Sequence, residues 1–141
     1  MRTSNQAIIS LVKDISLTAN ETFGDRCSAV YIMGSLARGG FSEVASDVDI
    51  GIVLGGDLKE SDRFDIDHVQ STSVERHPAV INAVSIFWGN TDSINGAVDG
   101  GRYPPFDRLD LIDHALLLSG VDRRQELLTP TQEELAIESA T

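Results

Sequence analysis

The stretch that decides the fold runs from Gly34-Ser35-Leu36-Ala37-Arg38 to Ser46-Asp47-Val48-Asp49-Ile50. Residues 27–33, just before it, are apolar and rich in strand formers, so they predict a buried strand. Residues 47–54 predict a second strand, whose first half alternates acidic and aliphatic residues. Alternate side chains of a strand project from one face, so Asp47 and Asp49 are expected to lie on the same side of the sheet.

Gly34 and Ser35 directly follow the first predicted strand. Glycine lets the backbone approach an anion closely, and a helical turn opening at Ser35 would direct free N–H groups at a phosphate. The Ser35 hydroxyl adds one further donor. A Gly-Ser pair after a strand is common, so this half of the pattern indicates a phosphate site only weakly by itself.

The Asp47-x-Asp49 pair is the second half of the pattern. Two carboxylates on one strand face repel each other, and in a buried site they need a cation between them. Mg²⁺ prefers oxygen ligands and substrate phosphates, and such ions hold the attacking and leaving oxygens of an in-line displacement. A solvated turn is the commoner setting for a lone Asp-x-Asp, so the metal prediction depends on the combination with Gly34-Ser35.

Together these residues resemble the signature of the DNA polymerase β-like nucleotidyltransferase superfamily, in particular its aminoglycoside adenylyltransferase-like group and its minimal nucleotidyltransferase domains. The motif of that family is Gly-Ser, a spacer and Asp-x-Asp. The spacer here, residues 36–46, has eleven residues, a length found in some branches. The resemblance covers residues 27–88 well and extends more loosely toward the C-terminus.

The resemblance implies a role for each matching residue. Gly34 and Ser35 would bind the phosphates of ATP or another nucleoside triphosphate, and the catalytic residues Asp47 and Asp49 would hold Mg²⁺. Arg38 would orient a phosphate or brace the loop, although an ordinary surface arginine is an equally good reading of it.

The chain departs from the family at the third acid, which active members place on the next strand as metal ligand or general base. That strand, within residues 79–88, has no Asp or Glu. Asn82 or Ser85 can face the site, but neither is a strong base. The other candidates are Asp92, just after the strand, and one of the pair Asp65 and Asp67.

The order of the predicted elements indicates an α/β (α+β) fold with a small mixed β-sheet flanked by helices, and the resemblance implies that this is the nucleotidyltransferase fold. We expect one domain over residues 1–141, with a core at about 5–118 and a C-terminal helical extension at 119–141. The further predicted elements are a helix at 5–23, a mostly exposed helix at 58–76, a strand at 79–88, a loop at 89–105, a helix at 106–118 ended by Gly120, and a helix from Thr131 with Glu134 as its capping-box partner.

Composition narrows the predicted partners. Eleven Lys and Arg stand against twenty-two Asp and Glu, a net charge of -11, which suits a nucleic-acid backbone poorly. The chain has one cysteine, Cys27, so it cannot form a disulfide within itself, which indicates a reducing compartment. Its apolar stretches are all too short to predict a membrane span. We expect a cytoplasmic protein whose partners are a nucleotide and an acceptor, with a homodimer or a toxin as the protein partner.

The leading hypothesis is transfer of a nucleoside monophosphate, most simply AMP from ATP, to a hydroxyl of a small molecule or protein. Because the third acid is missing, a catalytically impaired nucleotide-binding or protein-interaction module is an alternative, and so is an antitoxin-type minimal nucleotidyltransferase. Trp88, at the end of the third predicted strand, stacks on a base or packs in the core, and the sequence favours packing.

Overall fold

The computed structural model describes residue 3 and residues 5–140. Its helices are α1 (Gln6–Phe23), α2 (Gly34–Arg38), α3 (Asp62–Arg76), α4 (Thr91–Ile94), α5 (Pro105–His114) and α6 (Gln132–Ala140). Its strands are β1 (Cys27–Ile32), β2 (Val48–Leu54), β3 (Val84–Gly89) and β4 (Leu116–Gly120). Two short 3-10 turns, at Gly24–Arg26 and Arg124–Glu126, complete the regular structure.

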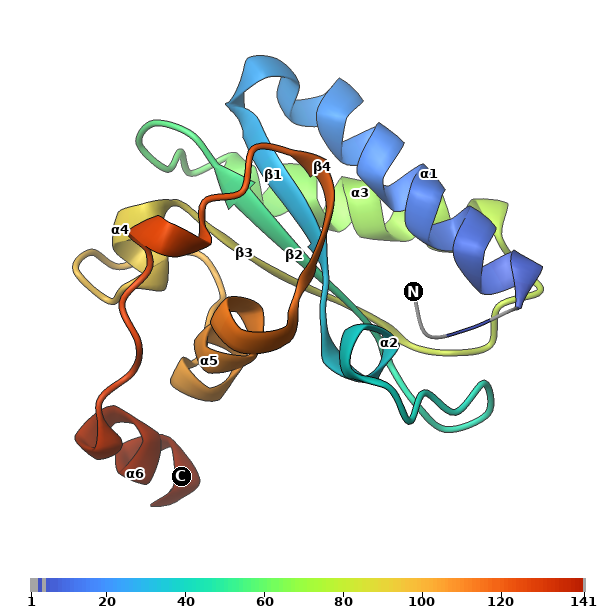
Figure 1. Cartoon of the computed structure of the whole chain (residues 1–141). Coiled ribbons are helices and arrows are strands. Elements are labelled where there is room, and N and C mark those ends of the chain that lie inside the picture. The colour runs from blue at the N-terminus through green and yellow to red at the C-terminus, as the bar shows by residue number, and fades with distance from the viewer. Residues whose placement is uncertain (1–2, 4, 141) are drawn as a thin grey trace.

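The four strands form one sheet in the order β3-β2-β1-β4 (Figure 1). β2 and β3 are parallel, whereas β1 is antiparallel to both β2 and β4. The connection between the parallel strands passes through α3, as a crossover requires. The predicted α/β fold with a small mixed sheet flanked by helices is therefore confirmed.

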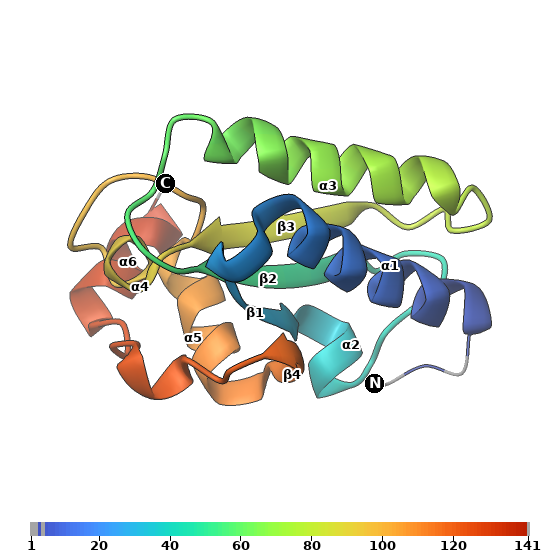
Figure 2. The same cartoon turned by 90° about the horizontal axis from the view of Figure 1, so that it is seen from above.

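The two faces of the sheet carry different cores. Helices α1 and α3 cover one face, and α5 lies on the other (Figure 2). The larger cluster joins α1 and α3 to alternate residues of β2, namely Val48, Ile50, Ile52 and Leu54. The smaller cluster packs α5 against the opposite face and includes Tyr31, Met33, Val53, Phe87 and Leu111. Since side chains alternate along a strand, Asp49 projects into the α5 face.

The prediction of one helix over residues 106–118 is wrong beyond His114. Residues Leu116–Gly120 form the edge strand β4, which pairs antiparallel with β1. Leu116 and Leu117, which continue the apolar helical spacing, are 39% and 40% exposed on this strand. Gly120 ends the strand rather than capping a helix, and its φ of +86° places it directly against the Ser28 carbonyl.

Two further boundaries differ from the prediction. β3 begins at Val84 rather than at residue 79, because the Asn82 side chain donates to the Ser46 carbonyl at 2.8 Å and holds the preceding segment against the loop before β2. Helix α3 begins at Asp62 rather than at residue 58. It is mostly exposed, as predicted: Phe64 is 75% exposed, while Ile66 and Val69 are buried against the core.

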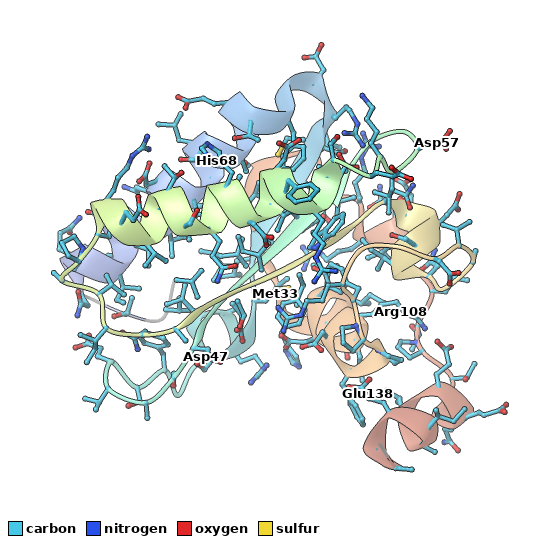
Figure 3. The ribbon with its side chains drawn as sticks, turned by 180° about the vertical axis from the view of Figure 1, so that it is seen from behind. Met33, Asp47, Asp57, His68, Arg108 and Glu138 are labelled. Atoms are coloured by element: carbon cyan, nitrogen blue, oxygen red, sulfur yellow. The ribbon has the colours of Figure 1, made fainter. Side chains whose placement is uncertain are left out.

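The region predicted as a loop at 89–105 contains α4, whose N-cap Asn90 forms a capping box with Ser93. The predicted capping box at α6 is confirmed, since Thr131 Oγ1 accepts from the Glu134 N–H and Glu134 Oε1 accepts from the Thr131 N–H, each at 3.1 Å. Arg108 of α5 ties these parts together, donating to the Ile94 carbonyl at 2.9 Å and to Glu134 Oε2 at 2.7 Å (Figure 3).

Among the described residues, none of the helices has the length and apolar character that crossing a membrane requires.

Candidate nucleotide and metal site

The centre of the site is the contact between Gly34 and Asp49. Gly34 opens α2 at a φ of +62°, a conformation that favours glycine, and a Cβ built on it would collide with Asp49 Oδ2. The Met33 N–H donates to the Asp49 carbonyl at 2.9 Å, which fixes the end of β1 beside the start of β2. The sequence-predicted loop and the second acid of the Asp-x-Asp pair therefore share one small volume.

Asp47 and Ser35 stand at the border of this volume. Asp47 is exposed and precedes β2 (Figure 3), and its negative charge adds to the effect of burial in raising the Asp49 pKa. Ser35 is half-buried in the first turn of α2. Gly34 contacts Asp49, and Asp47 lies two residues before Asp49 in the chain.

Helix α5 adds carboxylates that the sequence did not single out. Asp110 accepts a hydrogen bond from the Gly34 N–H at 2.9 Å and one from Arg38 Nη1 at 2.7 Å. Arg38 thus braces the loop, which is one of its two predicted roles. Asp107 lies one helical turn earlier, and its charge acts on the same group of carboxylates.

The site is crowded with negative charge. Burial raises the Asp49 pKa, and the nearby carboxylates Asp47 and Asp110 add to that effect, while Arg38 and Arg102 oppose it. Burial also raises the pKa of Asp107 to about 6, with further repulsion from Glu138 and Asp49. A bound cation would relieve this repulsion, because it would favour the charged form of each carboxylate.

The donor set fits Mg²⁺ delivered with a nucleotide rather than a closed metal cage. Within the described part of the chain, no group of three or more His, Cys, Asp and Glu side chains is arranged to hold a metal ion by itself. Mg²⁺ commonly takes one or two carboxylates and completes its shell with phosphate oxygens and water. Asp47 and Asp49 next to the Gly34-Ser35 loop supply that kind of incomplete set.

The structure shows which candidates for the missing third acid lie beside Asp49 and which do not. Ser85 pairs with Asp49 in the parallel register and lies on the same face, so the position next to Asp49 on β3 carries a hydroxyl. Asn82 is occupied with the Ser46 carbonyl. Asp65 and Asp67 belong to α3, which covers the opposite face.

Asp92, the remaining candidate for the third acid, lies too far from Asp49. It follows the C-terminal end of β3 in α4, whereas Asp49 pairs with Ser85 near the N-terminal end of the same strand. Gly89 lies four positions after Ser85 along the strand, which is roughly 13 Å at the usual rise per residue. Asp92 therefore does not contribute to the site.

A match to known proteins decides the family. The model of the nucleotidyltransferase domain family matches residues 17–95, more than half of the chain and all of the site on β1, α2, β2 and β3. The chain belongs to the nucleotidyltransferase domain family. No curated protein sequence matches it significantly.

Solved structures show the same fold at low sequence identity. A toxin–antitoxin complex with AMP-PNP contains a chain that is 13% identical, with a TM-score of 0.52 over 91% of this nucleotidyltransferase domain and 87% of that chain. A mutant MntA–HpeT toxin–antitoxin complex contains a chain that is 11% identical, with a TM-score of 0.51 over 91% of this chain and 87% of that one. At these identities the likeness concerns the fold.

Replacing Asp107 is expected to stabilise this nucleotidyltransferase domain. The folded-state pKa of about 6 lies above the ordinary aspartate value, so the fold holds a proton that the unfolded chain releases, and stability falls as pH rises from about 4 through 6. We expect Asp107→Asn to raise the free energy of unfolding by about 1–2 kcal/mol at pH 8, after a reduction for partial exposure and for the lost helix-terminus charge.

Urea unfolding of both proteins at pH 4 and pH 8 measures this effect. The gain should vanish at pH 4, where the wild-type carboxyl is protonated. Asp113→Asn, on an exposed position of the same helix, is the matched control and should stay within about 0.5 kcal/mol of wild type at both pH values. An equal gain at both pH values would contradict the electrostatic explanation.

Proposed function

We propose that this nucleotidyltransferase domain transfers a nucleoside monophosphate, AMP from ATP, to a hydroxyl group of a small molecule or protein, and that the reaction depends on Mg²⁺. The observation that supports this most is the contact between Gly34 and Asp49. It brings a loop suited to phosphate oxygens against a carboxylate suited to a divalent ion. The AMP-PNP in a complex of similar fold is consistent with a nucleoside triphosphate as donor.

Each residue has a distinct task in this proposal. The Ser35 hydroxyl and the backbone of the loop hold the triphosphate, and Asp47 and Asp49 are the ligands of Mg²⁺. When bound, the ion neutralises charge that develops on the phosphate oxygens and holds attacking and leaving groups in line. Asp107, whose pKa burial raises to about 6, is a candidate to accept the hydroxyl proton, because a base works best with a pKa close to the working pH.

The position of the phosphate label in ATP tests the reaction type. With ATP labelled in the α-phosphate and a panel of small-molecule and protein hydroxyl acceptors, we expect label on the acceptor and release of unlabelled pyrophosphate. With label in the γ-phosphate, the acceptor should stay unlabelled. A chelator should abolish transfer and added Mg²⁺ should restore it, whereas γ-label on the acceptor would mean phosphoryl transfer and would contradict the proposal.

A second candidate is a nucleotide-binding or protein-interaction module without chemistry. Ser85 at the position next to Asp49 supports it, since a hydroxyl replaces the acid there. Calorimetry separates the two, because this candidate requires binding of ATP with Mg²⁺ and no pyrophosphate release with any acceptor.

An antitoxin role is a third candidate, supported by the fold shared with chains of toxin–antitoxin complexes. Co-purification with a small helical partner protein would favour this role. It is compatible with transfer if that protein carries the acceptor hydroxyl.

A further inference from the structure

A groove of about 290 Å³ lies beside the outer edge of β3, where Trp88 forms an antiparallel bridge with Arg102. Helix α3 forms one wall, and the segment after α4 forms the other. Trp88 and Ile86 of β3 form its floor. The residues that line it are Arg63, Ile66, Asp67, Gln70, Ile86, Trp88, Gly101 and Arg102.

Among the described residues, two arginines of the groove form no ion pair with a carboxylate. Six other arginines of the described residues each form an ion pair with an Asp or Glu: Arg26, Arg38, Arg76, Arg108, Arg123 and Arg124. No such pair includes Arg63 or Arg102 within the described part of the chain, although the protein has twenty-two acidic residues. With Asp67 as the one acid among its lining residues, the groove has a net positive charge in a protein whose net charge is -11.

Arg102 connects this groove to the nucleotide and metal site. Its Nη1 donates to the Ile86 carbonyl on the edge of β3 at 3.2 Å, and its guanidinium carbon lies 4.3 Å from the centre of the Phe87 ring, on the face of the sheet that carries Asp49. Its charge acts on Asp49 and on Asp107. Arg102 therefore reaches around the outer edge of the sheet, from the groove on the α3 side to the face that carries Asp49.

The groove lies at the β3 end of the sheet, away from β1 and the Gly34-Ser35 loop. The Gly34-Ser35 loop continues from β1, and the sheet order places β2, with Asp49, between β1 and β3. In an in-line displacement the attacking oxygen enters opposite the leaving group. If the loop holds the pyrophosphate that leaves, the attacking hydroxyl comes from the β3 side, where the groove is.

We propose that the β3-edge groove binds the acceptor, and that the acceptor carries an anionic group beside a flat or apolar part. This inference deepens the proposed function and rests on it. Arg63 and Arg102 would bind the anion, and Trp88 and Ile86 would contact the flat part. The acceptor oxygen forms a bond to the α-phosphorus, the bond from that phosphorus to pyrophosphate breaks, and the hydroxyl proton passes to a carboxylate of the site.

Trp88 is the one tryptophan of the sequence, so its fluorescence reports on the groove directly. We expect phenyl phosphate at millimolar concentration, without nucleotide or metal, to change this fluorescence saturably, and neutral benzyl alcohol to leave it unchanged. Benzoate in a parallel titration shows whether the anion is a phosphate or a carboxylate. Arg63→Gln should weaken the binding roughly tenfold or more, because it removes a charge-assisted contact.

Arg76→Gln is the matched control, since Arg76 is on the same helix but pairs with Asp14 outside the groove. It should leave the titration unchanged. The proposal is overturned if no anion changes the fluorescence saturably, or if both arginine variants respond alike. It is also overturned if ATP with Mg²⁺ competes with phenyl phosphate, because the groove would then belong to the donor nucleotide.

The fluorescence titration and the label experiment for the proposed function can fail independently of each other. The titration contains neither ATP nor Mg²⁺, so it succeeds or fails whether or not the chain transfers a nucleotide. If transfer is observed in the label experiment while the groove binds no anion, only the acceptor assignment is wrong.

Discussion

Asp49→Asn is expected to reduce nucleotide transfer by at least a factor of about 10³, which corresponds to about 4 kcal/mol of transition-state stabilisation. The substitution keeps the shape of the side chain and removes the charge that would hold Mg²⁺. Asp49 is half-buried, and a Cβ on Gly34 would collide with its carboxylate, so this carboxylate lies directly against the loop. Initial rates with labelled ATP at saturating Mg²⁺ measure the loss.

The same variant should not lose stability. The Asp49 pKa is raised by burial and by the carboxylates Asp47 and Asp110, so the charged form weakens the folded state at neutral pH and a neutral amide relieves that penalty. A thermal midpoint equal to or above the wild-type value, together with lost activity, would separate a catalytic effect from misfolding.

Asp92→Asn is the matched control for Asp49→Asn. Asp92 has the same side chain but lies beyond the far end of β3, so its substitution should leave transfer unchanged. If Asp49→Asn keeps full activity with Mg²⁺, the assignment of the metal site is wrong.

The sequence predicted the strands and the loop around the site because each of them depends on residues that are neighbours in the chain. The strand before Gly34, the glycine at the loop and the acid–aliphatic alternation from Asp47 to Ile50 each depend on neighbours in the chain. The family match over residues 17–95 confirms the family that this pattern indicated. The roles of Asp47 and Asp49 as metal ligands stay a prediction.

Features that depend on distant contacts were missed. Residues Leu116–Gly120 continue an apolar helical spacing, yet they form an edge strand because β1 offers a free edge about ninety positions earlier in the chain. Local spacing contains no information about that edge.

The carboxylates of α5 were missed for the same reason. Asp107 and Asp110 look like ordinary charges on an amphipathic helix, and only the packing of α5 near α2 brings them to Gly34 and Asp49. Two acids three residues apart, after a long glycine-rich segment, are a weak signal that these positions meet a functional site.

Gly34→Ala is the prediction with the second-largest effect, a loss of transfer by about 10²-fold. An added Cβ meets Asp49 Oδ2 and must displace either the carboxylate or the loop, and misplacement of a reacting group by about 1 Å costs a factor of this order. The positive φ of +62° adds backbone strain, so the free energy of unfolding should fall by about 1–3 kcal/mol.

Gly56→Ala separates the clash from the strain. Gly56 has a similar φ of +72°, but no atom lies within 4 Å of a Cβ built there, and it lies after the opposite end of β2. It should lose about 1 kcal/mol of stability from the backbone alone and keep its activity at temperatures well below its melting point. If the two alanine variants lose equal stability and Gly34→Ala still transfers nucleotide at the wild-type rate, the close approach of the loop to Asp49 has no part in the reaction. If only Gly34→Ala loses both nucleotide affinity and rate, the contact between loop and carboxylate is the structural feature on which the chemistry depends, because strain of the same kind is present in both variants.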